Sequence, residues 1–271
     1  YWGDFWCDWT GAAGGLAVTL RQAQQNFPKA MEVTPGSLRI SLYPAGQDAL
    51  AFPLGAAKTH RMLFHFHSPD AAQEEISYRS LQFQIPDVPT FASDWYARCG
   101  VWDERVFEGP RSRRIEALVY DHLDNRPVGM GIWNFGDEVE WGYTGQGRGK
   151  DEVVWLNNEY DFAHLLFVEY ARSGERRFLD YAQANAEHWR DVDIDHASPN
   201  PARRGGHIAH SARHRTGGVA PSHQWVEGLM DAWHYFGDRW AYEAALGIGE
   251  NILRAIESPR YKDPAQTTTR E

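Results

Sequence analysis

The sequence predicts a chain in two parts, a β-rich segment over residues 1–90 and an array of helical hairpins over residues 91–271. Apolar and polar residues alternate in several stretches of the first part, as in half-buried strands. A helix–turn–helix pattern recurs in the second part. With 271 residues, 42% of them hydrophobic and 24% charged, the chain suits one large or two smaller globular domains with a buried core.

The β-rich segment contains three stretches with the period of a strand. Residues 15–20 (GLAVTL) and 37–44 (SLRISLYP) alternate and are bounded by Gly or Pro, and residues 60–67 (HRMLFHFH) alternate again. Between the first two, residues 23–33 (AQQNFPKAMEV) predict a short helix that is interrupted near Pro28. We therefore expect strands to dominate this part of the chain.

A helix–turn–helix unit recurs in the helical part of the chain. Residues 164–189 predict a helix, a glycine turn and a second helix, and residues 227–252 align with them without a gap. The Gly-Glu-Arg that begins at Gly174 falls on the Gly-Asp-Arg that begins at Gly237, as expected where glycine ends one helix and an acid opens the next. A weaker third copy ends at Gly100. Recurring hairpins predict an α/α array, either a solenoid or a closed toroid.

Two long connections, residues 101–157 and 190–223, interrupt the helical pattern, and long ordered loops are usually functional. Residues 197–226 contain no Asp or Glu although the chain has 37 of them and a formal net charge of −10. Glycine pairs bracket most of the cationic and titratable side chains of this stretch, which are Arg203, Arg204, Arg213, Arg215, His207, His210, His214 and His223. The plainer alternative is a solvated loop that balances the acidic residues just upstream.

This set of side chains fits an acidic sugar. Arg and His⁺ bind a carboxylate, while neutral His or Tyr transfers protons, and β-elimination from a uronic acid needs both. The candidate bases and acids are Tyr160, His207, His210, His214 and His223. The candidate carboxylate neutralisers are Arg203, Arg204 and Asn158. The candidate sugar platforms are Trp141, Trp155 and Trp225. Taken singly, each is more simply a packed or surface residue, so the set carries the hypothesis.

Metal binding is the competing hypothesis for the same loop. The histidines at 207, 210 and 214 have helical spacing, and Asp191, Asp193 and Asp195 could supply oxygens. However, Gly205 and Gly206 weaken a helix there, and the zinc-hydrolase pattern of two His with a Glu between them is missing. The Asp run is similar to a calcium loop but lacks its glycine and distal Glu. We assign no metal and no cofactor, and leave room for a divalent cation such as calcium.

Composition limits the classes of partner that the chain is expected to bind. The negative net charge argues against nucleic acid and membrane surfaces, which are both polyanionic. No apolar run reaches the length of a membrane span. The 12 Trp, 12 Tyr and 13 Phe supply packing and also flat faces that stack on sugar rings. Cys7 and Cys99, without zinc-type spacing, either pair or stay free.

Four segments, residues 56–67, 157–196, 205–214 and 222–238, resemble the exo-rhamnogalacturonan lyase / YetA-like family of polysaccharide lyases. The resemblance implies a mainly α fold, an α/α toroid preceded by a β-sandwich portion. Residues 1–90 would then be the end of the sandwich, and residues 91–271 an incomplete toroid. It also implies elimination at a rhamnosyl–galacturonate linkage, and carries function onto Lys58, His60, Tyr160, His207, His210, His214 and His223.

The expected function is therefore that of a polysaccharide lyase acting on a rhamnose–uronate polymer such as rhamnogalacturonan. Its partner would be an acidic polysaccharide of the plant-cell-wall type, and a secreted or periplasmic setting follows from that substrate. One alternative is a glycoside hydrolase that uses Glu159 and Glu227, which stand where predicted helices begin. Another is a carbohydrate-binding module without catalysis.

Overall fold

The computed structural model describes residues 5–102, 113–125 and 129–259. The chain divides into two compact units. The N-terminal unit consists of Tyr1–Ala51, Lys58–Pro89 and Met130–Trp133, and the C-terminal unit of Phe52–Ala57, Thr90–Gly129 and Asn134–Glu271. Each unit therefore takes a short segment from the part of the chain that mainly builds the other.

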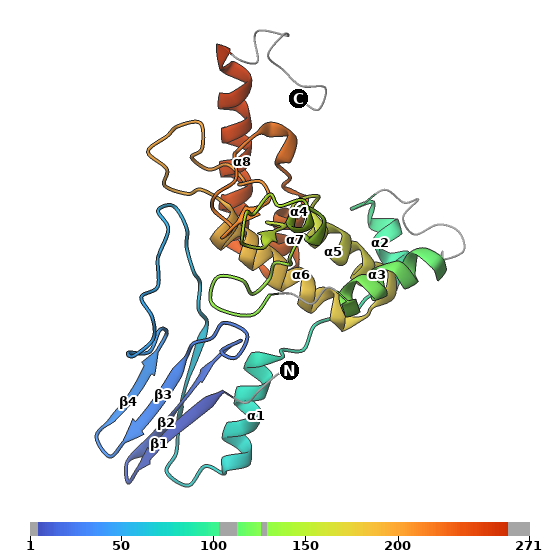
Figure 1. Ribbon diagram of the computed structural model, residues 1–271. Helices are drawn as coiled ribbons and strands as arrows, with labels where there is room; N and C mark the ends of the chain where they lie inside the picture. Colours follow the sequence, from blue (N-terminus) through green and yellow to red (C-terminus); the bar gives the residue numbers. More distant parts are fainter. Residues whose placement is uncertain (1–4, 103–112, 126–128, 260–271) are drawn as a thin grey trace. The chain divides into compact units, whose positions relative to one another are not determined.

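The N-terminal unit is built on an antiparallel sheet with strand order β1-β2-β5. The strands are β1 (Trp6–Gly11), β2 (Gly14–Leu20) and β5 (Met62–His67), and a separate hairpin pairs β3 (Ala30–Thr34) with β4 (Ser37–Ser41). Helix α1 (Gln73–Gln84) contacts β2 and β5, as Figure 1 shows. Val18, Leu20 and Ile76 are buried in the core of this unit.

The strands predicted at residues 15–20, 37–44 and 60–67 are confirmed, but the predicted helix at 23–33 is wrong. Its second half is β3, in which Met31 pairs with Ile40 and Val33 with Leu38. Helix α1 was not predicted. Its buried residues, Ile76, Ser80 and Gln84, are spaced four apart as in a helix, yet only the first is apolar. The apolar period that identifies a helix is therefore absent.

Seven helices of the C-terminal unit are α2 (Ser93–Cys99), α3 (Arg113–Asn125), α4 (Trp141–Gly145), α5 (Phe162–Ser173), α6 (Arg176–His188), α7 (Glu227–Phe236) and α8 (Arg239–Glu257). A π-helical turn (Trp189–Asp193) extends α6, and a 3₁₀ turn (Pro221–His223) precedes α7. The short strands β6 (Val154–Trp155) and β7 (Ser211–Ala212) pair antiparallel.

Both predicted helical hairpins are confirmed. Gly174 (φ 72°) and Gly237 (φ 64°) end α5 and α7 in the left-handed conformation that glycine adopts readily. Helix α5 packs on α6 and α7, and α7 packs on α8, as can be followed in Figure 1. Phe167, Phe178 and Leu229 are fully buried among these helices. The hairpins form the scaffold on which the long connections fold.

The expected fold class, a mainly α chain with an α/α toroid preceded by a β-sandwich portion, is wrong. Among the described residues the fold is mixed α and β, with small sheets and eight helices, and neither a toroid nor a sandwich is present. One reason is that residues 190–223 form turns and β7 rather than a further hairpin. Another is that the N-terminal strands form one three-stranded sheet and one separate hairpin.

Within the described residues, no helix combines the length and the hydropathy needed to cross a bilayer. Cys7 and Cys99 are both free thiols.

Candidate functional site

The candidate site lies in the C-terminal unit, where two long connections meet. Val154 pairs with Ala212 and Trp155 with Ser211, so β6 and β7 join the segment before α5 to the histidine-rich loop. The Asn157 side chain donates hydrogen bonds to the carbonyl oxygens of residues 208, 209 and 214, at 3.0, 3.1 and 2.8 Å. One buried amide thus holds the loop against the turn that precedes α5.

That turn, residues 157–161, has an unusual backbone. Asn157, Asn158, Tyr160 and Asp161 all have φ between 52° and 66°. Left-handed conformations cost free energy in residues other than glycine, and they persist only where the surroundings hold them. Here Asp137 accepts the backbone N–H of Asn157 at 2.9 Å, and Asp161 accepts that of His164 at 3.1 Å. The turn therefore presents Glu159 and Tyr160 in fixed directions.

Glu159 is the centre of one group of side chains. It is buried and accepts three N–H groups: the backbone N–H of His210 at 2.9 Å, Nδ1–H of His210 at 2.8 Å and Nδ1–H of His223 at 3.0 Å. Burial by itself raises the pKa of Glu159, but the hydrogen bonds and charge of His210 and His223 outweigh it and lower the pKa. Glu159 is therefore an anionic anchor for two imidazoles.

The outer face of His210 meets a cation. Arg148 Nη1 lies 3.2 Å from His210 Nε2, and the Arg148 guanidinium sits 3.9 Å above the Tyr143 ring. Arginine only donates hydrogen bonds, so Nε2 of His210 accepts and its proton resides on Nδ1, facing Glu159. We call Glu159, His210, His223, Arg148 and Tyr143 the Glu159 cluster.

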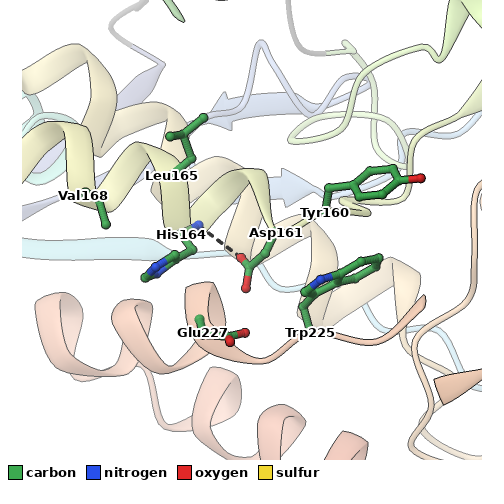
Figure 2. A pocket seen from close by; sticks show the side chains of 7 residues that line it. All are labelled: Tyr160, Asp161, His164, Leu165, Val168, Trp225 and Glu227. Atoms are coloured by element: carbon green, nitrogen blue, oxygen red, sulfur yellow. Dashed lines mark hydrogen bonds between the residues drawn. The ribbon is translucent and has the colours of Figure 1, made fainter. Parts of the chain in front are cut away.

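A pocket of about 400 Å³ lies beside this cluster. It is lined by Tyr160, Asp161, His164, Leu165, Val168, Trp225 and Glu227. Figure 2 shows Tyr160 and Trp225 at one end, the α5 side chains at the other and the two carboxylates between them. The rings of Tyr160 and Trp225 are 5.4 Å apart, and Trp225 is 6.5 Å from His223. These two aromatic residues therefore connect the pocket to the Glu159 cluster.

The carboxylates of the pocket have unequal environments. Asp161 accepts the backbone N–H groups of His164 and Gly228, and so caps both α5 and α7. Burial raises its pKa to about 6. Glu227 is exposed and has a lowered pKa, because backbone hydrogen bonds at Val226 and Glu227 outweigh its partial burial. The Asp231 carboxylate, 2.6 Å from His164 Nδ1, raises the pKa of His164.

A second group, which we call the Asp137 cluster, comprises Asp137, His188, Asp193 and His214 and is buried. His214 Nδ1 lies 3.3 Å from Asp137 Oδ2, and His188 Nε2 lies 3.2 Å from Asp193 Oδ1. Burial lowers the pKa of His214. Both clusters combine imidazole nitrogens with carboxylate oxygens at spacings that could hold a metal ion.

The structure brings together only part of the predicted site. His210, His223, Tyr160 and Trp225 lie on one partly exposed face, and Glu227 lines the adjoining pocket. Five other predicted site residues of the C-terminal unit lie outside this face. His207 and Asn158 are buried, His214 belongs to the Asp137 cluster with Trp155 stacked on it at 4.6 Å, and Trp141 is exposed on α4. Lys58 and His60 belong to the N-terminal unit.

The loop arginines are engaged by partners close by. Arg203 pairs with Asp195 at 3.0 Å and donates to the carbonyl of Gly217 at 2.9 Å. Arg204 donates to the carbonyl of Ser198 at 3.0 Å. Their role in binding a substrate carboxylate stays a prediction, but much of their donor capacity is used within the loop.

Three important residues were missed. Arg148 stands in a glycine-rich stretch with no motif, and Asp137 and His188 are isolated in the sequence. Of the expected cation ligands, Asp193 and His214 come together in the Asp137 cluster. Asp191 instead pairs with Arg190, and Asp195 pairs with Arg203 and Arg215. In the sequence, only the residues within and directly beside the histidine-rich loop point to this site.

Comparison with known proteins adds one relative. No family model matches the chain. Over 230 residues the chain is 23% identical to "Uncharacterized protein YetA" of Bacillus subtilis (strain 168). The chain is similar to YetA. The match covers 69% of the chain and 26% of YetA, so the chain spans about a quarter of that relative, whose name states no activity.

Proposed function

We propose that the Glu159 cluster, together with Tyr160 and Trp225, binds an acidic polysaccharide and cleaves it by β-elimination. The substrate class would be a rhamnose–uronate polymer such as rhamnogalacturonan. The observation that carries the proposal is the pair of histidines, His210 and His223, held through Nδ1 on one buried carboxylate with Arg148 beside them. The similarity to YetA is compatible with this proposal and names no activity.

The geometry suggests a role for each group. Arg148 is exposed and can bind the uronate carboxylate, which stabilises the charge that develops when C5 loses its proton. His223 Nε2 is the base, because Nδ1–H of His223 is held by Glu159 while Nε2 of His210 already accepts from Arg148. The C5–H electron pair forms the C4–C5 double bond and the C4–O bond breaks. Tyr160 then gives its proton to the departing oxygen.

The aromatic pair supports sugar binding. Tyr160 is 60% exposed, and Trp225 lies beside it at one end of the pocket. Flat, partly exposed rings bind the apolar faces of sugars, and their hydroxyl or N–H group stays available for hydrogen bonding. A sugar that stacks on Trp225 would lie next to His223, 6.5 Å away between ring centroids.

The hydrolase alternative fits the geometry less well. A glycosidase places two carboxyl groups about 5–9.5 Å apart on either side of the bond that is cleaved. Glu159 is buried and fully used by His210 and His223, and Asp161 and Glu227 are hydrogen-bonded to each other. None of these three carboxylates is therefore both open to solvent and free of a hydrogen-bonding partner.

The test is to incubate protein that carries this chain with rhamnogalacturonan and to follow the ultraviolet absorbance of the C4–C5 double bond. We expect His223→Gln to lower kcat by about 10²–10⁴-fold, because a general base is lost. Arg148→Gln should raise KM as well, because the substrate carboxylate loses its partner. The control is Arg213→Gln, since Arg213 is an exposed arginine that pairs with Glu152 on the surface.

Three outcomes would contradict the proposal. New reducing ends without the absorbance would indicate hydrolysis. Saturable sugar binding without turnover would indicate a binding module. An unchanged rate in His223→Gln would remove this histidine from the reaction.

A further inference from the structure

Four buried side chains of the C-terminal unit converge on one point from three segments that are remote in sequence. Asp137 precedes β6, His188 ends α6, Asp193 ends the π-helical turn and His214 follows β7. One nitrogen or oxygen of each lies within 4.8 Å of those of the others, and no side chain in the group is more than 2% exposed. The group is therefore closed to solvent on all sides.

The two imidazoles turn unprotonated nitrogens inward. Nδ1–H of His188 donates to the carbonyl of Phe135 at 3.1 Å, so its Nε2 faces Asp193 Oδ1 at 3.2 Å. Nε2–H of His214 donates to Asn134 Oδ1 at 3.2 Å, and its Nδ1 lies 3.3 Å from Asp137 Oδ2. A carbonyl oxygen only accepts, so in a neutral ring the inner nitrogen carries a lone pair. His214 Nδ1 has no hydrogen-bond partner although it is buried.

The carboxylates are oriented in the same way. Asp137 Oδ2 accepts the backbone N–H of Asn157 at 2.9 Å, and Asp193 Oδ2 accepts the side-chain amide of Asn158 at 3.1 Å. Within the described residues, the ion-pair contacts of Asp137 and Asp193 are with His188 and His214 alone. Two buried negative charges that face imidazole lone pairs repel strongly unless a cation lies between them.

We propose that Asp137, His188, Asp193 and His214 bind one divalent ion of the zinc class in a four-coordinate site. Two imidazole nitrogens and two carboxylate oxygens form a set that zinc accepts in tetrahedral geometry. Calcium and magnesium prefer oxygen ligands and more of them. The hydrogen bonds to Phe135 and Asn134 are the outer-shell contacts that orient metal-binding histidines.

The ion would have a structural role, because four protein ligands and complete burial leave no open coordination position. It would also hold the turn of residues 157–161, since the same two carboxylates accept hydrogen bonds from Asn157 and Asn158. This inference is independent of the proposed lyase activity. A protein of any function could use the ion to fix this turn.

The experiment titrates the chelator-treated chain with Zn²⁺ alone and, separately, with Co²⁺ alone. We expect one equivalent of either ion to bind, a rise in the melting temperature and the strong visible absorption of tetrahedral Co²⁺. Asp193→Asn and His188→Gln should lose this binding. The matched control is His210→Gln, which alters the Glu159 cluster and should keep one equivalent.

A further variant covers the case in which the first two fail to fold. His214→Cys places a thiolate at the same position. A cobalt–thiolate charge-transfer band in the near ultraviolet that is absent from the wild-type chain, which already carries the free thiols of Cys7 and Cys99, appears only if residue 214 binds the ion. The inference is overturned if the wild-type chain binds no stoichiometric Zn²⁺ or gives the weak spectrum of octahedral Co²⁺. It is also overturned if His210→Gln loses the ion while Asp193→Asn keeps it, since the Glu159 cluster would then be the site.

Discussion

At the scale of single residues, two buried carboxyl groups hold the site together. The groups that surround each one set the direction in which its pKa shifts. Glu159 meets two imidazoles and a backbone N–H, and its pKa falls. Asp161 is buried to a similar depth but meets neutral backbone N–H groups and the Glu227 carboxylate, and its pKa rises to about 6. Two acids only two residues apart therefore ionise over different pH ranges, because the interactions with His210 and His223 outweigh burial at Glu159, whereas burial prevails at Asp161.

The raised pKa of Asp161 predicts a pH-dependent stability. In the unfolded chain the group titrates at about 3.8, and in the folded chain at about 6. The folded state therefore binds the proton more tightly, and its contribution is fully present below about pH 4 and lost as the pH rises to about 6. The loss is on the order of 3 kcal/mol, moderated by His164 and Glu227, which titrate beside it.

Asp161→Asn removes this titration and serves as the comparison. Urea unfolding of both proteins between pH 4 and pH 7 should show the wild-type free energy of unfolding falling relative to that of the variant up to about pH 6, then running parallel. A difference that is constant over the whole interval, or that grows in favour of the wild type, would show that the Asp161 carboxyl group is not buried as described.

The sequence could predict the residues whose chemistry is visible locally, but not their pairing. Tyr160, His210 and His223 were predicted as a set because they stand in polar helix entries or between glycines. That Glu159 anchors both histidines depends on contacts across 51 and 64 residues, and the Arg148–His210 contact spans 62. The sequence shows a glycine pair on each side of the histidine-rich loop but not what the glycines are for. A side chain at Gly205 would lie 2.7 Å from the carbonyl oxygen of Gly247, so close packing explains that glycine.

At the scale of the elements, the sequence predicts where the hairpin helices end better than it predicts the tertiary contacts around them. The glycine and acid at the two hairpin turns depend on local backbone geometry alone, and both turns form as expected. Helix α6, in contrast, continues into a π-helical turn that brings Asp193 close to His188. No local pattern indicates that turn, although such irregular turns are frequent at functional sites. It exists because tertiary contacts hold it.

The two hairpin turns differ in one respect that predicts unequal sensitivity to mutation. Asp238 caps α8 by accepting the backbone N–H groups of Trp240 and Ala241, and it also pairs with the buried Arg190. Asp238→Ala should lower the free energy of unfolding by about 3–5 kcal/mol, because it removes a helix cap and leaves a buried guanidinium short of a partner. Chemical denaturation measures the loss.

The matched control is Glu175→Ala at the equivalent position of the first hairpin. Glu175 is exposed and makes no capping hydrogen bond, and its side chain accepts one exposed hydrogen bond, from the Tyr120 hydroxyl, so the change should stay within about 1 kcal/mol. Asp238→Asn should fall between the two, because the amide oxygen can still cap α8 but the charge is lost. Equal losses at the two hairpins would mean that the buried ion pair contributes nothing.

At the scale of the whole molecule, the order of segments along the chain does not match their division between the two compact units. The local periods identified three strands, β2, β4 and β5, and the four hairpin helices, but they carry no information about how many hairpins pack together. The repeat left a solenoid or a closed toroid open, and the choice of a toroid preceded by a sandwich portion came from the family resemblance. The chain spans 26% of YetA, so it covers only part of that relative. Phe52–Ala57, which stands among the strands in sequence, belongs to the C-terminal unit.

The assignment of Phe52–Ala57 to the C-terminal unit leads to a last prediction. Gly55 has φ +82°, and a Cβ there would lie 2.2 Å from Asp195 Oδ1, within the ion pairs that Asp195 forms with Arg203 and Arg215. Gly55→Ala should therefore lower the free energy of unfolding by about 2–4 kcal/mol, through backbone strain and the displaced carboxylate.

Hydrogen exchange locates the effect. Faster exchange should appear around residues 190–215 of the C-terminal unit, while the sheet β1-β2-β5 stays protected. Gly36→Ala is the control, because its Cβ would meet no atom within 4 Å and the backbone there needs no left-handed φ. If Gly55→Ala instead loosened the N-terminal sheet, this segment would belong with the strands that surround it in sequence. The loop that carries His210 would then lack the support that Gly55 and Leu54 give it through His196 and Arg215.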